Sequence, residues 1–437
     1  MNFVSLFGLL GLVGIAWLLS SDRRRFPVRV VVWGLALQLA FGLVVLSPAA
    51  QQFFFTGVDA GVRKLLSFSE QGATFVFQSV EAHQIADANG VPTTYAGRIS
   101  PPVKTFAFWI LPSIVFFSTL MSITYHLGIM QWVVRGMAWL MQRTMRTSGA
   151  ETLSTAANVF LGQTEAPLLV KPFVVRMTRS ELFCVMVGGF ANTAGGVLAA
   201  YVGFLSHIPG IAGHLVTSSI LSAPATLVIA KVMMPEREVP ETAGQLRIHD
   251  ERPDRNVMES AARGATEGMS LAINVAAMLI AFVGIMAAVD WLFSLVPMAV
   301  CDGGVQFGYP DGCAPLSLSR ILGWVFTPVA LLLGVGLSEA PTVGMLLGEK
   351  LVLTEFVAYI HLGEIMASAE PLSPRSAIIA SYALCGFANI ASVGIQLGGI
   401  GGMAPGRMGD LAELGIRAMI GGSLATFMTA CIAGALL

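Results

Sequence analysis

The chain has 437 residues, of which 55% are apolar or aromatic and only 12% are charged. Soluble domains carry about 25% charged residues, so this chain has too few to cover a soluble protein of its size. Its 25 basic and 26 acidic residues nearly cancel, which excludes an electrostatic partner such as nucleic acid. The composition therefore predicts an all-α polytopic membrane protein whose surroundings are the lipid bilayer.

Eight apolar segments are predicted to span the membrane. The first runs from Val4 to Ser20, and Arg23 to Arg25 come after it. A secretory signal carries its positive charge before the apolar run, so we expect this segment to be retained as the first span. The other spans are expected at about 28–48, 105–126, 181–205, 211–232, 266–298, 374–397 and 413–436.

Three further segments connect these spans. Residues 129–147 alternate Arg135, Arg143 and Arg146 with apolar residues, which predicts an amphipathic helix on the membrane surface. Residues 235–263 are charged and contain three prolines, which predicts a soluble loop. A short apolar segment with Pro328 follows the loop that holds Cys301 and Cys313. These two cysteines would form a disulfide if the loop faces an oxidising compartment, and the alternative is two free thiols.

Positive charge sets the predicted orientation, because cytoplasmic loops collect Lys and Arg. The arrangement puts 18 of the 25 Lys and Arg residues inside. The other seven would lie outside: Arg63, Lys64, Arg98, Lys104, Arg320, Lys350 and Arg375. This bias favours both termini on the outer side, which is the periplasmic side of a bacterial inner membrane.

Two apolar stretches, at about 150–177 and 338–366, have polar residues at their centres. Each half is only about 10–12 residues long, too short to cross a bilayer. A broken, polar centre is tolerated at membrane depth only where protein or a cavity surrounds it. We therefore predict two re-entrant hairpins, the first entering from the inside and the second from the outside.

The chain also contains an internal repeat. GFANTA at 189–194 matches GFANIA at 386–391 in five of six positions, and each copy lies within a predicted span. A Thr-Glu pair lies in the hairpin upstream of each copy, at 164–165 and 354–355. One full span separates the two units, so the second is inverted. An inverted repeat with polar helix breaks is typical of a secondary transporter with its site near the midplane.

Carboxylates and amides in the repeat are the candidate functional groups. A carboxylate at the bilayer centre costs about 2.5–3.5 kcal/mol, so Glu165 and Glu355 require an explanation. The structural alternative is an ion pair or a loop position. For Asn192 and Asn389 the alternative is a helix–helix hydrogen bond, and for Asn158 it is a bond within the hairpin.

Four motifs together resemble the concentrative nucleoside transporter family. They are GQTEAPLLVKPF at 162–173, GFANTAGGVLAAY at 189–201, EKLVLTEFVAY at 349–359 and CGFANIASVGIQLGG at 385–399. The resemblance implies eight spans, two re-entrant hairpins, a homotrimer and an elevator-type movement of a transport domain across a scaffold. It implies inward symport with Na⁺ of nucleosides such as uridine, cytidine or adenosine. Asn192, Thr193 and Thr354 stand where members of the family vary, which leaves the ion stoichiometry and the base preference open.

The resemblance also implies binding roles. Gln163, Thr164 and Glu165 would face the nucleobase between Val197 and Phe387. Glu355, Asn389 and Ser392 would hold the ribose. Sodium would bind Asn158, the Leu161 carbonyl, Asn192 and the Thr193 carbonyl. The implied domain boundaries are 1–149 and 233–337 for the scaffold with its loops, and 150–232 and 338–437 for the two transport repeats.

Other classes fit less well. A carrier of dicarboxylates or amino acids would want Arg or Lys at the hairpin tips, where this chain has Glu165 and Glu355. A channel would need a polar stripe along a pore, whereas the polar groups here cluster at midplane breaks. An enzyme is not expected, and no catalytic residue is predicted, because the chain has no P-loop, HExxH helix or nucleophile–base pair.

Overall fold

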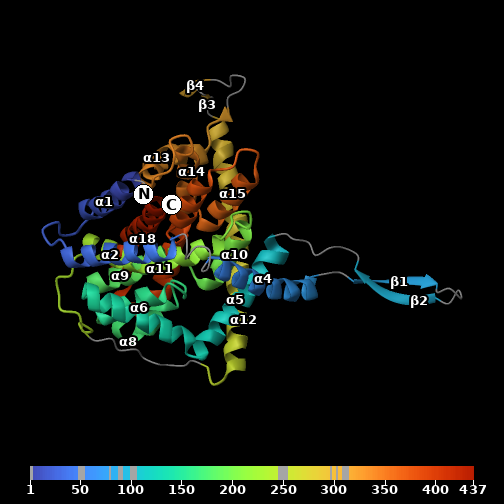
Figure 1. The fold of residues 1–437 in the computed structure, drawn as a ribbon, viewed down its shortest axis with the longest axis horizontal. Coiled ribbons are helices and arrows are strands. Elements are labelled where there is room, and N and C mark those ends of the chain that lie inside the picture. Colours follow the sequence, from blue (N-terminus) through green and yellow to red (C-terminus); the bar gives the residue numbers. More distant parts are fainter. Residues whose placement is uncertain are drawn as a thin grey trace.

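The computed structural model describes residues 3–47, 55–77, 80–86, 92–98, 106–244, 254–295, 298–301, 304–307 and 314–437. These residues form a helical body with two small sheets in its connecting segments (Figure 1). Both chain ends lie in the upper part of the body, where α1 (Phe3–Leu18) packs against α18 (Met408–Leu436).

Six helical segments of the described chain are long and apolar enough to cross a membrane. The remaining two predicted spans are shorter or broken. The first is α1, with 16 residues, and the seventh is divided into α16 (Pro374–Leu384) and α17 (Ile390–Met403). The six segments are Val28–Val45, Ala107–His126, Arg179–Phe204, Ile211–Met233, Val257–Ser294 and Pro405–Leu436. The amphipathic helix predicted at 129–147 is α6 (Ile129–Met145).

The two predicted repeat units have matching helix orders. In the first, α7 (Gly149–Ala157) leads through η3 (Ala166–Val170) and α8 (Lys171–Val174) to α9 (Arg179–Ala191), α10 (Gly195–Phe204) and α11 (Ile211–Met233). In the second, α14 (Ala340–Val352) and α15 (Glu355–Ala367) precede α16, α17 and α18. Both arms of the second hairpin have 13 residues, about 20 Å of helix each, too short to cross the hydrocarbon core.

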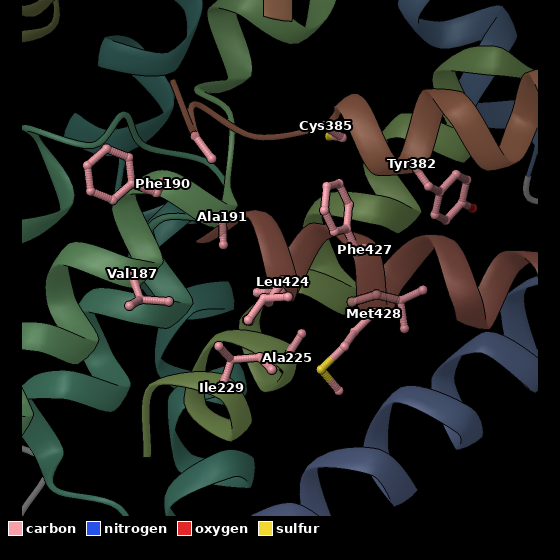
Figure 2. Close-up of a cluster of buried hydrophobic side chains, with 14 of the residues drawn as sticks. Val187, Phe190, Ala191, Ala225, Ile229, Tyr382, Cys385, Leu424, Phe427 and Met428 are labelled. Atoms are coloured by element: carbon pink, nitrogen blue, oxygen red, sulfur yellow. The ribbon is translucent and has the colours of Figure 1, made fainter. Parts of the chain in front are cut away.

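The two units share one apolar core. Figure 2 shows side chains from α9, α11, α16 and α18 meeting beside the broken spans, including Phe190, Ile229 and Phe427. The breaks themselves are joined, because the Phe387 N–H donates to the Asn192 carbonyl at 3.3 Å. The matching interruptions therefore lie together at the centre of the fold.

Helix α12 (Val257–Ser294) packs along α5 (Leu111–His126). Its 38 residues extend about 57 Å, almost twice the hydrocarbon thickness. Glycines at 264 and 268 allow close contact, since a Cβ at Gly268 would lie 2.8 Å from the Val115 Cα. The helix begins nine residues before the predicted start at 266, because the Asn256 side chain accepts the Glu259 N–H at 2.9 Å and caps it. The end of the predicted loop 235–263 is therefore helical.

Several elements were not predicted. Between the second and third spans lie α4 (Thr56–Phe77) and a hairpin of β1 (Val80–Ala86) and β2 (Pro92–Arg98), which projects from the body (Figure 1). Strands β3 (Met298–Cys301), β4 (Gly304–Phe307) and β5 (Ala314–Pro315) form the second sheet. The short apolar segment with Pro328, which the sequence did predict, forms α13 (Leu318–Leu333). Because Cys313 is outside the described residues, so is the predicted Cys301–Cys313 pairing.

Candidate functional site

A cavity of about 130 Å³ lies where the two hairpin tips, the two broken spans and α12 meet. All eight residues predicted to contact the substrate line it. They are Gln163, Thr164, Glu165, Val197, Glu355, Phe387, Asn389 and Ser392. Residues almost 200 positions apart in the sequence thus share one surface, as the repeat requires.

Of the two carboxylates among the described residues of the cavity wall, Glu355 accepts more hydrogen bonds from other side chains. It is 2% exposed and is the first residue of α15. Its Oε1 accepts from the Tyr201 hydroxyl at 2.9 Å, and its Oε2 accepts from the Asn389 amide at 2.8 Å. A carboxylate has about four lone-pair positions, so Glu355 can accept a further donor beside these two.

Asn389 has two roles, as the N-cap of α17 and as a residue of the cavity wall. Its Oδ1 accepts the Ser392 N–H at 2.8 Å and caps α17. Its Nδ2 donates to Glu355. The predicted alternative for Asn389, a hydrogen bond between helices alone, does not describe both of its bonds. Its side chain also links the end of the break to the tip of the second hairpin.

Gln163 is held by a chain of amides. Its Nε2 donates to the Ser392 hydroxyl at 3.4 Å, and its Oε1 accepts from the Gln396 Nε2 at 3.3 Å. Gln396 is fully buried and also donates to the Met186 carbonyl at 3.1 Å. Both ends of the Gln163 amide thus have partners, which favours one orientation of that amide toward the cavity.

The first hairpin presents a second carboxylate, which differs in its surroundings. Glu165 is exposed, and its Oε1 accepts from the Thr164 hydroxyl at 3.1 Å. The Glu165 N–H donates to the Gly162 carbonyl at 3.2 Å in a tight turn. A Cβ at Gly162 would clash with the Glu165 Oε2, so a larger residue there would displace this carboxylate from its present position.

Two of the predicted sodium ligands, Asn158 and Asn192, lie close together at the first broken span. Asn158 ends α7 and is fully buried, and neither Oδ1 nor Nδ2 of its amide has a hydrogen-bond partner among the described residues. Asn158 and Asn192 both lie beside Gly188. The Asn192 amide donates to the Gly188 carbonyl at 3.1 Å. A Cβ built on Gly188 would lie 3.1 Å from the Asn158 Nδ2.

An unpartnered buried amide needs a ligand, because burial without a hydrogen bond is costly. The amide oxygens of Asn158 and Asn192, together with main-chain carbonyls of Leu161 and Thr193, are the hard oxygen donors that a small cation prefers. The described part of the chain has no cluster of three or more His, Cys, Asp or Glu that could hold a metal. The residues present therefore fit Na⁺ better than a transition metal.

Sequence reasoning missed three parts of this region. Tyr201 and Ser222, which donate to Glu355 and Asn192, lie in apolar helices where single polar residues gave no signal. Gln396 could have been noticed as the one amide of the GIQLGG motif. The α12 wall of the cavity is wholly apolar, so only its helical spacing could have marked it: Leu271, Val275, Met278 and Leu279.

The fold and the cavity define a multi-pass membrane transporter with two helical hairpins and two broken helices around a central site. Family models of Na⁺-dependent nucleoside transporters match the chain in two parts, an N-terminal part at 7–80 and a C-terminal part at 214–434. A nucleoside recognition model matches residues 107–207. The chain belongs to the Na⁺-dependent nucleoside transporter family.

Individual relatives agree with this assignment. The chain is 42% identical to an uncharacterized transporter of Haemophilus influenzae, covering 98% of this chain and 96% of that protein. It is 39% identical to solute carrier family 28 member 3 of Mus musculus, of whose length it spans 59%. Among solved structures, CNTnw in an inward-facing, substrate-bound state matches with a TM-score of 0.84 and 36% identity, covering 99% of this chain and 98% of that one. These relatives are transporters, not enzymes.

Proposed function

We propose that this protein imports nucleosides by symport with Na⁺. The observation that carries the proposal is the convergence of both hairpin tips on one cavity, with Glu165 and Glu355 facing it and no basic side chain among the described residues that line it. A neutral ligand rich in hydroxyl donors suits this set, because carboxylates accept from hydroxyls and repel anions. The proposal is supported by the family, whose members depend on Na⁺.

The roles proposed for the lining follow its chemistry. Glu355, Asn389 and Ser392 would bind the ribose, since the Glu355 carboxylate can accept a further hydrogen bond from a hydroxyl. Gln163, Thr164 and Glu165 would bind polar edges of the base, and Val197 and Phe387 would cover its faces. Uridine, cytidine and adenosine are the proposed substrate class.

Na⁺ is proposed to bind between the first hairpin and the first broken span, at Asn158, Asn192 and the carbonyls of Leu161 and Thr193. The unpartnered Asn158 amide supports this assignment. Because this position adjoins the break that carries the cavity wall, ion and nucleoside should stabilise the same arrangement of hairpin and break. Positive coupling between the two ligands follows from that shared arrangement.

The movement proposed is of elevator type. The cavity has one wall from the two repeats and the other from the apolar face of α12, so it lies along a boundary between units that could slide. Solved structures of CNTnw and its variants include inward-facing, intermediate and outward-facing states. We further propose a homotrimer in a bacterial inner membrane with both termini periplasmic. The proposed moving units are residues 150–232 and 338–437.

Reciprocal binding tests the proposal. Purified protein should bind uridine more tightly as Na⁺ is raised, and uridine should tighten Na⁺ binding by the same factor, with K⁺ as the control ion. The Glu355→Gln variant should lose uridine binding and keep Na⁺ binding. Equal uridine affinity in Na⁺ and in K⁺ would contradict symport with sodium.

A further inference from the structure

Lys350 is a buried cation that the proposed function does not use. The charge count assigned it to the outer side of the membrane, whereas in the structure it lies on α14 of the second hairpin and is only 1% exposed. Its Nζ donates to the Ala383 carbonyl at 2.8 Å and to the Thr426 hydroxyl at 3.0 Å. The Phe427 ring centre lies 5.9 Å from the Nζ, within range of a cation–π contact.

No carboxylate lies within salt-bridge distance of this ammonium among the described residues. The Glu355 carboxylate attracts this ammonium only from beyond contact distance. A cation at membrane depth without a contacting anion is costly and calls for an explanation. The other buried lysine, Lys231, differs in this respect, because its Nζ lies 2.6 Å from the Glu151 carboxylate. The ligands of Lys350 are instead neutral oxygens: a helix-end carbonyl and a hydroxyl, the donor types that bind an alkali cation.

The place of Lys350 in the repeat supplies the explanation. The proposed Na⁺ site of the first unit is built by the first hairpin arm (Asn158 of α7), the end of the first half-span (Asn192, after α9) and, through Ser222, the next span, α11. Lys350 lies on the first hairpin arm of the second unit. It reaches the last turn of the half-span α16 at Ala383 and the next span, α18, at Thr426.

The same three kinds of element thus surround the proposed Na⁺ site in the first unit and the Lys350 ammonium in the second. The C-terminal end of a broken helix carries partial negative charge from its free carbonyls, which favours a cation in both places. We propose that the Lys350 ammonium occupies, in the second repeat, the position that Na⁺ takes in the first, and so limits coupling to one Na⁺ per nucleoside.

This inference rests on the proposed function and adds a stoichiometry to it. The Lys350 ammonium is attached to the protein, so it permanently neutralises the partial negative charge of the helix end. It uses no energy from the Na⁺ gradient. Because it returns with the protein in every cycle, it adds no net charge to each nucleoside moved. Replacing it with a shorter oxygen-bearing side chain should leave room for a second free cation beside Ala383 and Thr426.

The test uses the full-length protein in proteoliposomes, with Na⁺ and uridine fluxes measured together by ²²Na⁺ and tritiated uridine. The K350N variant introduces an amide, as found at Asn158. Its Hill coefficient for Na⁺ and its Na⁺-to-uridine flux ratio should rise from about one to about two. Its half-saturating Na⁺ concentration should rise about tenfold, since a tethered cation has become a free ligand.

Two further variants complete the design. K350M keeps the length of the side chain without charge or space for an ion, and it should lose at least about 90% of uptake at every Na⁺ concentration, as expected for an unfilled cation position. K171M, which replaces an exposed lysine of the first hairpin, is the control and should behave as wild type. K350S is a second oxygen-bearing variant in case K350N does not fold.

The outcomes separate the two proposals. A folded K350N or K350S with one Na⁺ per uridine and unchanged half-saturation would overturn the assignment of Lys350. So would wild-type uptake by K350M, or aggregation of all three variants, which would give Lys350 a role in folding alone. Absence of Na⁺-coupled uptake in the wild-type protein would instead overturn the proposed function.

Discussion

The hydroxyl of Tyr201 offers a sharp test of how the ribose site is organised. It donates to Glu355 Oε1 at 2.9 Å, and the ring is fully buried. The ring stacks on Tyr359 with centres 4.2 Å apart and planes 23° apart. Tyr201→Phe removes only the hydroxyl, because the stacked ring can remain in place.

The size of the effect follows from the bond that is lost. A hydrogen bond to a charged group contributes about 1.5–3 kcal/mol. If Glu355 must be held for the ribose, the Kd of uridine should rise by about 10- to 150-fold, since each 1.4 kcal/mol corresponds to a factor of ten. The upper limit applies only if the carboxylate turns fully away from the cavity. Isothermal titration of uridine at saturating Na⁺ measures this change.

Tyr359→Phe is the matched control. Tyr359 is equally buried and belongs to the same stacked pair, but its hydroxyl donates to the Ser381 carbonyl at 2.7 Å. Both variants should lose thermal stability, and only Tyr201→Phe should lose affinity. The affinity loss should also shrink for 2′- or 3′-deoxyuridine, whichever lacks the hydroxyl that Glu355 binds. Equal uridine affinities for the two variants would refute a positioning role of Tyr201.

Three other predictions concern the proposed sodium site, the Gln163 amide and the packing of α12. Asn158→Ala should raise the half-saturating Na⁺ concentration for uptake at least about tenfold by removing an amide ligand, and an unchanged Na⁺ titration would argue against that site. Gln396→Leu frees the Gln163 amide and should change the ratio of uridine to adenosine affinity about 3- to 10-fold, the effect of one neutral hydrogen bond; a constant ratio in competition binding would count against this role. Gly268→Val overpacks the contact of α12 with α5 and should destabilise the protein by about 1–3 kcal/mol. Gly284→Val on the same helix, where a Cβ meets nothing within 4 Å, should not, and equal melting temperatures for the two would disprove the packing argument.

Much of the architecture was accessible from the sequence because its signals are periodic or repeated. Apolar runs marked the spans, and the polar centres at 163–165 and 354–355 marked the hairpin tips. The duplicated GFAN motif located the broken spans, and the eight proposed substrate contacts do line one cavity. Roles within that cavity came from the family resemblance and remain proposals.

The residues that sequence reasoning misplaced or missed depend on long-range contacts, and the segments that it missed lack a local signal. Lys350 was counted with the charges on the outer side of the membrane, and only the approach of α16 and α18 buries it. Tyr201 gains its role from Glu355, 154 positions away. The α12 wall has no polar residue to mark it. The segment at 49–104 lacks a continuous apolar run, so α4 and the β1–β2 hairpin carried no membrane signal.

Uridine accumulation in proteoliposomes tests the central claim most directly. Tritiated uridine uptake would be followed with an inward Na⁺ gradient, with equal Na⁺ on both sides, and with K⁺ replacing Na⁺. We predict accumulation above the external concentration only with the gradient, and its collapse when an ionophore dissipates Na⁺. Equal uptake under all three conditions, reaching only the external concentration, would contradict sodium-coupled nucleoside transport.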